Sequence, residues 1–339
     1  VVRHRIASRP TPATPLTMVS HDQLRRSKAI QRHTGRTFHL ATRLLPERVR
    51  YPTYVLYAFF RTADDVVDDP DPAPPAERRR ELERLRAAAL GEREPDDPVL
   101  EAFADLRERH DIPRAEVDAF VDSMLMDVEK RRYHTHDELS TYLRGSAAAV
   151  GHMMLEVMDP PRKEAARPHA AALGEAFQLT NFLRDVHEDV RDYDRIYLPE
   201  RVLVEHGSSH DDVASLTPTD GFRAAVRDEL ARTEQLYHYG VEGVRYLPEG
   251  CQLPVLTAAV MYADQHRLVR QLDCDVLSTR PTLTMRRRLS LVARTWLRWQ
   301  FGADPRSVFY RVTGLDAPDG VDERPSLRLS TSDALARSD

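Results

Sequence analysis

Residues 51–70, YPTYVLYAFFRTADDVVDDP, join an apolar and aromatic helix to four carboxylates at its C-terminal end, Asp64, Asp65, Asp68 and Asp69. Carboxylates at that end meet the negative pole of the helix dipole and one another, so the arrangement costs stability unless cations compensate. Asp64 and Asp68 are four residues apart and share one helix face, where their oxygens can hold a hard cation together. The alternative is a solvated acidic helix end, because this spacing is common by chance.

A second oxygen-rich ladder lies in residues 173–199, LGEAFQLTNFLRDVHEDVRDYDRIYLP. Asn181, Asp185 and Asp189 follow one another at intervals of four, which places them on one helix face. Two such ladders with embedded arginines suit Mg²⁺, which proteins hold through a few carboxylates together with phosphate oxygens and water. The pattern therefore predicts a diphosphate substrate. His187 is as readily a surface partner as a ligand, since no HExxH or Cys/His spacing supports zinc.

The composition favours helices. The chain has 339 residues, 41% of them apolar, with 13 glycines and isoleucine at only four positions, while Ala, Leu, Arg and Glu dominate. An all-β or Rossmann-type fold is therefore disfavoured. The 49 basic and 54 acidic residues give a net charge of -5, which argues against a dedicated nucleic-acid binder.

The two cysteines, Cys251 and Cys274, have no CxxC spacing and cannot form a disulfide framework or a thiolate zinc cluster, so a reducing cytoplasm is the default compartment. The longest apolar stretch, around residues 254–263, is far shorter than the ~20 residues that cross a bilayer. We therefore expect a soluble or at most peripheral protein.

Segments with helical periodicity run from about residue 21 to residue 300 and are separated by prolines and glycines. In residues 82–90 and 117–128, apolar positions recur at intervals of three or four. The spacing of the breaks predicts roughly eight to twelve helices of ordinary length. We predict a disordered leader over residues 1–20, one catalytic domain over 21–313 and a mobile polar tail over 314–339.

From about Gln31 to Leu289 the chain resembles the squalene/phytoene synthase family, the head-to-head prenyl synthases of the trans-isoprenoid synthase fold, and within it the prokaryotic phytoene synthases look most similar. The resemblance implies an all-α single domain, with helices around a central cavity and the two aspartate motifs facing each other across its mouth. It rests on five blocks in order: GRTFHLATRLLP (35–46), FFRTADDVVDD (59–69), MDVEKRRY (126–133), YLRGSAAAVGHMM (142–154) and FQLTNFLRDVHEDVRDYDRIYLP (177–199).

The resemblance also implies roles for the residues that match the family's motifs. The catalytic residues would be Arg61, Tyr142 and Arg184. Substrate contacts would come from Arg36, Thr37, Tyr57, Arg61, Gln178, Arg184, Tyr262 and Arg280. Mg²⁺, with Mn²⁺ as the alternative ion, would bind Asp64, Asp68, Asn181, Asp185 and Asp189.

Two of the motifs depart from the family pattern. The usual Ser-Lys/Arg-Ser-Phe is Gly35-Arg36-Thr37-Phe38 here, so position 35 has no hydroxyl to contact a phosphate. The family's Tyr-Cys-Tyr/His…Ala-Gly element is Tyr142-Leu143-Arg144…Ala148-Ala149, a change that is expected to reshape the channel. Both changes lie within what a phytoene synthase could tolerate.

The chemistry that these residues fit is ionisation of an allylic diphosphate, which leaves a dispersed carbocation and a diphosphate anion. The rings of Phe38, Tyr57 and Tyr142 could stabilise the positive charge through their faces, and ordinary core packing is the alternative for each ring. The small residues of 145–151 leave room for a prenyl chain, although close helix packing explains them equally well.

The activity that the resemblance implies is that of a Mg²⁺-dependent 15-cis-phytoene synthase of carotenoid biosynthesis. Two geranylgeranyl diphosphates would condense through prephytoene diphosphate to phytoene with release of diphosphate, and no NADPH is expected. One alternative is a thirty-carbon dehydrosqualene or squalene synthase that uses farnesyl diphosphate. Another is a non-catalytic assembly factor on the same fold, against which the two intact aspartate ladders count.

A forty-carbon product leaves a protein poorly into water, because each buried CH₂ contributes ~0.8 kcal/mol. We therefore expect a cytoplasmic enzyme whose cavity opens towards an apolar patch that touches the membrane reversibly. The alternative is transfer of the product to a downstream carotenoid enzyme. The sequence does not indicate the oligomeric state.

Overall fold

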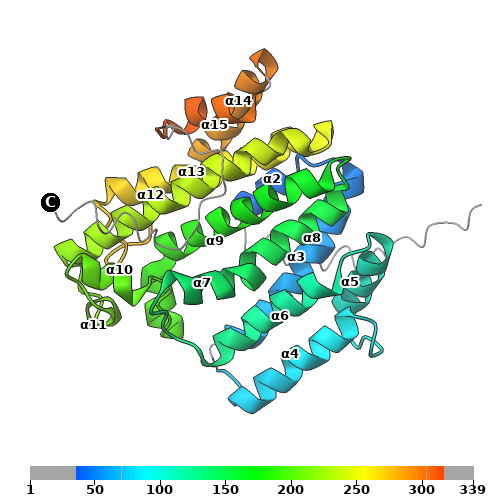
Figure 1. Cartoon of the computed structure of the whole chain (residues 1–339), viewed down its shortest axis with the longest axis horizontal. Helices are drawn as coiled ribbons and strands as arrows, with labels where there is room; N and C mark the ends of the chain where they lie inside the picture. Colours follow the sequence, from blue (N-terminus) through cyan, green and yellow to red (C-terminus); the bar gives the residue numbers. More distant parts are fainter. Residues whose placement is uncertain (1–35, 70, 303, 317–339) are drawn as a thin grey trace, which may run out of the picture.

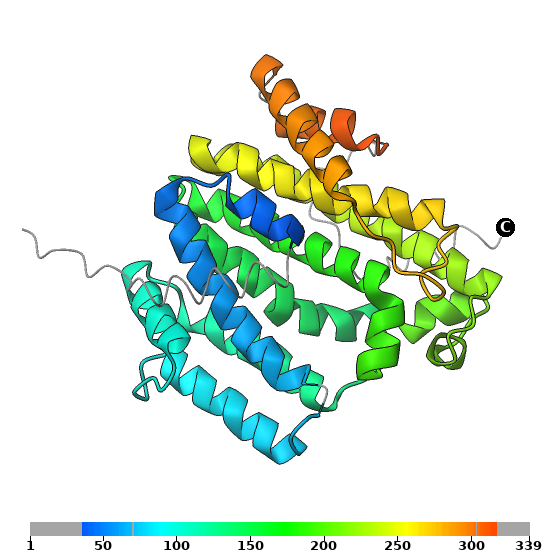
Figure 2. The ribbon, with the colours of Figure 1, turned by 180° about the vertical axis from the view of Figure 1, so that it is seen from behind.

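The described residues of the chain, 36–69, 71–302 and 304–316, fold into fourteen α-helices, one π-helix and one 3-10 helix without a strand (Figures 1 and 2). This computed structural model therefore confirms the all-α class. The helices are α2 (Arg36–Thr42), α3 (Glu47–Val67), α4 (Pro75–Ala89), α5 (Pro98–Arg109), α6 (Arg114–Glu129), α7 (His136–Leu143), η1 (Arg144–Ala148, the π-helix), α8 (Ala149–Met158), α9 (Lys163–Tyr193), α10 (Glu200–Glu205), α11 (His210–Ala214), α12 (Asp220–Glu242), η2 (Gly243–Tyr246, the 3-10 helix), α13 (Glu249–Gln271), α14 (Met285–Phe301) and α15 (Pro305–Thr313).

The starts of the helices follow from local sequence. Helices α3 and α6 begin directly after Pro46 and Pro113, and α4 and α5 have proline in their first turn. The carboxylate of Asp97 caps α5 by accepting a hydrogen bond from the backbone N–H of Val99 at 2.6 Å. The punctuation by proline and capping residues was therefore a sound guide to the boundaries.

The number of helices was underestimated, because fourteen α-helices lie within the described residues against an expected eight to twelve. The short helices α2, α10 and α11 have seven, six and five residues. Such short segments carry too few apolar positions to show a period. The predicted leader over 1–20 lies outside the described residues, as does the predicted tail beyond residue 316.

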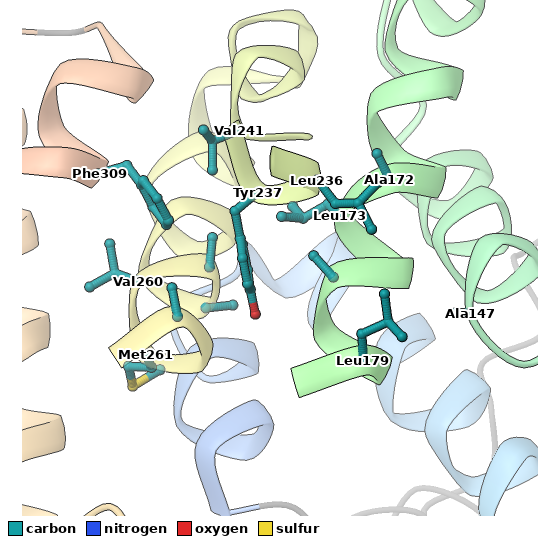
Figure 3. Packing of buried hydrophobic residues seen from close by; sticks show 14 of the residues in the cluster. Ala147, Ala172, Leu173, Leu179, Leu236, Tyr237, Val241, Val260, Met261 and Phe309 are labelled. Carbon is teal, nitrogen blue, oxygen red and sulfur yellow. The ribbon is translucent and has the colours of Figure 1, made fainter. Parts of the chain in front are cut away.

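Helix α9, with 31 residues, runs through the middle of the bundle and packs against α8, α12 and α13 (Figures 1 and 2). One core cluster joins α9, α12, α13 and α15 (Figure 3). At its centre Tyr237 of α12 is fully buried, with its ring centroid 5.8 Å from that of Phe309. Its hydroxyl lies 2.8 Å from Oγ1 of Thr180. This packing fixes the rotation of α9 and so the direction in which its polar ladder points.

Close backbone approach explains the small residues around η1. A Cβ atom on Gly145 would lie 2.0 Å from the carbonyl oxygen of Ala119 in α6, and one on Gly151 would lie 2.4 Å from that of Ala170 in α9. Ser146, Ala147 and Val150 of the same stretch line the cavity described below. Close packing thus explains the two glycines, while room for a prenyl chain beside the other three residues stays a prediction.

Gly145→Ala is expected to lower the free energy of unfolding by about 2 kcal/mol, because the new methyl group meets backbone that must move. Gly302→Ala is the matched control, since Gly302 has extended backbone and open space at its Cβ position. Urea denaturation of both variants would measure the difference. Equal stability of the two would contradict the close packing of η1 on α6.

Among the helices of the described residues, none combines the length and the apolar character that crossing a membrane requires.

Candidate active site

One cavity of about 630 Å³ opens between α3, α6, η1, α9, α13 and residues 280–288. It collects the predicted site residues from five separate parts of the chain. The side chains of Arg36, Thr37 and Phe38 lie outside the part of the chain that the structure describes. The other predicted residues all line the cavity: Tyr57, Arg61, Asp64, Asp68, Tyr142, Gln178, Asn181, Arg184, Asp185, Asp189, Tyr262 and Arg280.

The first ladder stands at the end of α3. Asp68 caps that helix, and its backbone N–H donates to the carbonyl oxygen of Asp64 at 2.9 Å. Arg61 lies one turn earlier, with Nη1 3.9 Å from Oδ2 of Asp64 and Nη2 2.9 Å from Oδ1 of Asp65. Asp64 and Asp68 line the cavity and are half-buried, whereas Asp65 and Asp69 are exposed and fit the alternative of a solvated acidic helix end.

The other compensating cation is Arg195, which sequence reasoning missed. Its Nη1 donates to Oδ1 of Asp68 at 2.7 Å. Its Nη2 donates to the carbonyl oxygens of Val67 at 3.1 Å and Asp127 at 3.4 Å, near the C-terminal ends of α3 and α6. A positive charge there opposes the negative ends of two helix dipoles. Arg195 directly follows the second ladder, and that position is the signal that could have identified it.

The second ladder lies on α9, where two guanidinium groups meet one carboxylate. Asp185 Oδ1 accepts from Nε of Arg184 at 2.6 Å and from Nε of Arg280 at 2.8 Å. Arg184 Nη1 also donates to Oε1 of Gln265 at 2.7 Å, and Arg280 Nη1 lies 2.7 Å from Oε2 of Glu188. The two arginines thus already contact the carboxylate oxygens that a cation at Asp185 would share with them.

The carboxylates of the two ladders are crowded and only partly neutralised. Burial within the cavity walls, together with the charge of Asp68, raises the pKa of Asp64 to about 7, against the opposing effect of Arg61. Burial and the charge of Asp185 likewise raise the pKa of Asp189 well above its usual range, and Arg195 opposes this. Carboxylates that are short of neutralising positive charge in this way fit a cation-binding region.

The geometry suits one type of metal binding in particular. No three His, Cys, Asp or Glu side chains within residues 36–69, 71–302 and 304–316 are close enough to enclose one ion. Mg²⁺ does not need such a cage, because it keeps water and takes one or two carboxylates together with substrate phosphate oxygens. The two ladders therefore fit Mg²⁺ shared with a diphosphate group. His187 points elsewhere, and its Nδ1 contacts the carbonyl oxygen of Leu277.

A buried carboxylate fixes the predicted active-site tyrosine. The hydroxyl of Tyr142 donates to Oδ2 of Asp127 at 2.6 Å, and that of Tyr197 donates to Oδ1 at 3.3 Å. The ring of Tyr197 is stacked on that of Phe182, with centroids 3.7 Å apart. Burial raises the pKa of Asp127 to about 6, although Arg195 and the hydrogen bond from Tyr142 oppose this. Asp127 lies in the MDVEKRRY block, but sequence reasoning assigned it no role.

The far side of the cavity is apolar, with Phe60, Phe120, Met124 and Met154 in its wall. Tyr262 faces it too, and its ring is stacked on that of Phe177 with centroids 4.5 Å apart. A narrower apolar cavity of about 130 Å³ shares part of this lining, namely Val150, Met154, Gly174 and Phe177. Polar groups that can hold a diphosphate thus stand beside apolar space that can hold hydrocarbon chains.

The second departure from the family pattern was expected to reshape the channel, and this stays a prediction for the described cavities. Leu143, Ala148 and Ala149 are buried and line neither of them. Arg144 turns away and lies 2.8 Å from Oε2 of Glu116. Gln265, a cavity residue that sequence reasoning missed, lies three positions after Tyr262 on α13 and is 2% exposed.

Comparison with known proteins supports the family resemblance that the sequence motifs indicate. The family model for squalene/phytoene synthase matches residues 31–287. The phytoene synthase of Rhodobacter capsulatus is 35% identical over 281 residues, which cover 82% of each chain. The 15-cis-phytoene synthase of Synechococcus elongatus is 30% identical over 310 residues, covering 86% of this chain and 97% of that one. A crystal structure of a dehydrosqualene synthase in complex with ligand superposes with a TM-score of 0.75 at 25% identity, covering 83% and 98%.

Proposed function

The chain belongs to the squalene/phytoene synthase family, and we propose on this basis that it is a phytoene synthase that joins two geranylgeranyl diphosphates head to head. The reaction would pass through prephytoene diphosphate to phytoene and release diphosphate. The observation that carries the proposal is one cavity whose lining combines two carboxylate ladders and five arginines with a set of apolar side chains. Bacterial phytoene synthases at 30–35% identity support this product over a thirty-carbon one.

The polar side of the cavity would bind and activate the diphosphate. Mg²⁺, when bound through Asp64, Asp68, Asn181, Asp185 and Asp189, would supply positive charge against the charge that develops on the leaving group. Arg184 and Arg280, which pair with Asp185 in this structure, would exchange that carboxylate for phosphate oxygens. Arg61 would contribute a further guanidinium from α3. The diphosphate would thus be held by donors that are already in place before the C–O bond breaks.

The apolar side would protect the carbocation that ionisation leaves behind. Phe60, Phe120 and Phe177 exclude water from this part of the cavity, and ring faces stabilise positive charge. Among the predicted residues, Tyr142 would stabilise the carbocation through its ring face. Its hydroxyl donates to Asp127 at 2.6 Å, which fixes the orientation of the ring. Asp127 is then a positioning residue that acts through Tyr142.

Tyr142→Phe and Asp127→Asn are each expected to lower kcat/KM about tenfold, since the first removes the buried hydrogen bond from Tyr142 to Asp127 and the second removes the charge of its acceptor. The double variant should lose little more than either single one, because both act through the same contact. Tyr133→Phe is the control, since the Tyr133 hydroxyl is buried without a hydrogen bond to any described residue. Steady-state kinetics with geranylgeranyl diphosphate would measure all four. Losses that multiply in the double variant would contradict the positioning role.

Two other functions compete with this proposal. A thirty-carbon dehydrosqualene synthase is favoured by the similarity to a solved structure of that activity. A non-catalytic assembly factor would have no need for the twelve predicted residues that line the cavity. Incubation of the purified protein with Mg²⁺ and either farnesyl or geranylgeranyl diphosphate, with and without NADPH, would separate them by product mass. Phytoene from geranylgeranyl diphosphate without NADPH is expected, and a thirty-carbon product or none would reject the proposal.

A cytoplasmic location and reversible contact with a membrane are part of the same proposal. They rest on the insolubility of a forty-carbon hydrocarbon in water. Transfer of product to a downstream carotenoid enzyme remains the alternative route.

A further inference from the structure

The outer face of α14 carries most of the large apolar side chains that the protein leaves exposed. Of the seven such side chains within the described residues, five belong to this helix, and each of the five is more than half exposed. Helix α14 lies outside α13 and its C-terminal end projects away from the bundle (Figures 1 and 2). The five residues, which we call the α14 face, are Met285, Leu289, Trp296, Leu297 and Phe301.

The spacing of three of these residues produces a continuous stripe. Met285, Leu289 and Trp296 stand at positions i, i+4 and i+11 of the helix, and half-buried Val292 fills position i+7. The side about a quarter turn away from this stripe is held in the protein by Arg288, Leu291 and Thr295, which are buried. One side of helix α14 therefore packs on the bundle, and a separate apolar stripe faces solvent. Contiguous exposed apolar surface of this kind marks an interaction site.

The charge around the stripe indicates what kind of partner fits. Helix α14 contains five arginines and no acidic residue, although the chain as a whole has a net charge of -5. Arg286 and Arg298 are exposed, and neither pairs with a carboxylate in the part of the chain that the structure describes. The helix also carries both tryptophans of the protein. Arginine, tryptophan and bulky apolar residues on one exposed helix are typical of segments that lie on an anionic lipid surface.

The α14 face lies beside the candidate active site. Residues 280–283 and Arg288, at the start of α14 and directly before it, form part of the cavity wall. A bilayer that contacted Met285 and Leu289 would therefore meet the rim of the cavity. Long-chain substrate and product could then pass between lipid and protein with little exposure of hydrocarbon to water.

We propose that the α14 face docks reversibly on an anionic lipid bilayer and places the rim of the cavity at its surface. This inference rests on the proposed function, because docking benefits the reaction only if substrate and product are long-chain prenyl compounds. Lipid binding itself is measured without substrate. A second copy of this chain would satisfy the apolar stripe equally well. It would bring together two helices that each contain five arginines and no acidic residue, which favours the lipid partner.

Flotation with lipid vesicles tests the proposal on the full chain. The vesicles are phosphatidylcholine alone and equal parts of phosphatidylcholine and phosphatidylglycerol. The wild-type protein is expected to float with the anionic vesicles and less with the neutral ones. Leu289→Ser/Trp296→Ser/Phe301→Ser and Arg286→Glu/Arg298→Glu should each weaken binding about tenfold or more. The matched control is Leu44→Ser/Val204→Ser, which changes the two exposed large apolar residues outside α14 and should bind like wild type.

Circular dichroism and sedimentation distinguish a loss of lipid binding from a loss of helical structure and from self-association. All variants are expected to retain the helical spectrum, since the changed side chains are exposed. A wild-type protein that stays in the soluble fraction with both vesicle types would overturn the proposal. So would triple-variant binding equal to wild type. An oligomer that the triple variant dissociates, without lipid binding by either protein, would identify the face as a contact between copies. Failure of phytoene synthesis alone would reject the proposed function and leave the flotation result standing.

Discussion

Asp64→Asn and Asp185→Asn are each expected to lower kcat/KM about 1,000-fold while the protein stays folded. Each change keeps the shape of the side chain and removes one negative charge from a ladder that faces the cavity. The remaining ligands would hold Mg²⁺ less tightly, so a higher Mg²⁺ concentration should be needed for half-maximal activity. Steady-state kinetics over a Mg²⁺ titration would measure both effects, and removal of the divalent ion should abolish activity in the wild type.

Asp192→Asn is the control for these variants, because it makes the same chemical change on α9 outside the cavity. Asp192 pairs with neighbouring Arg191 and lines no described cavity. Its kcat/KM and Mg²⁺ dependence should match those of the wild type. Near wild-type turnover with unchanged Mg²⁺ dependence in either Asp64→Asn or Asp185→Asn would show that the ligand assignment is wrong. The thermal midpoint of each variant tells loss of function from loss of fold.

The ladders were predictable because each lies on a single helix. The four-residue spacing of Asp64 and Asp68, and of Asn181, Asp185 and Asp189, fixes a shared face without knowledge of the tertiary fold. The structure then brings both faces to one cavity. The roles of these residues stay predictions, but their proximity did follow from local periodicity together with the family resemblance.

The residues that complete the site were not predictable in this way, since their partners are distant in sequence. Arg195 meets Asp68 across 127 positions of the chain, and no helical period connects them. Asp127 and Tyr142 lie on different helices, α6 and α7. The π-helix η1 directly follows α7, and no sequence pattern predicts a π-helix there. Gln265 accepts from Arg184 across 81 positions. Such contacts depend on how the helices pack, and the pattern of a single sequence does not predict that packing.

The buried polar residues around the site also show why helix ends were hard to interpret. Four carboxylates at the end of α3 looked costly from the sequence, because the compensating cations were not apparent. In the structure Arg195 contacts both Asp68 and the last carbonyl of α3, which removes much of that cost. A sequence feature that appears destabilising on its own was thus the strongest pointer to the site.

Arg184→Ala is expected to lower kcat/KM about 100-fold or more, because its guanidinium would donate to the leaving diphosphate when the C–O bond breaks. In this structure the same group is held by Asp185 and by Gln265, so it is oriented before substrate binds. Its removal would also free the Asp185 oxygens. The Mg²⁺ concentration for half-maximal activity should therefore not rise, in contrast to Asp185→Asn. Steady-state kinetics over the same Mg²⁺ range would separate a phosphate donor from a metal ligand.

Arg61→Ala should lose activity to a similar extent from the opposite wall, since Arg61 stands one turn before Asp64 on α3. Arg191→Ala is the matched control, because its guanidinium pairs with Asp192 on the exposed surface of α9. Melting temperatures of Arg61→Ala and Arg191→Ala should stay close to that of the wild type, as removal of partly exposed ion pairs usually costs less than about 1 kcal/mol. That of Arg184→Ala should fall, because Arg184 and Asp185 form a mostly buried pair. Unchanged kcat/KM in both Arg61→Ala and Arg184→Ala would mean that these arginines only neutralise carboxylates. A raised Mg²⁺ requirement in Arg184→Ala would instead mean that Arg184 holds Asp185 in position for the metal.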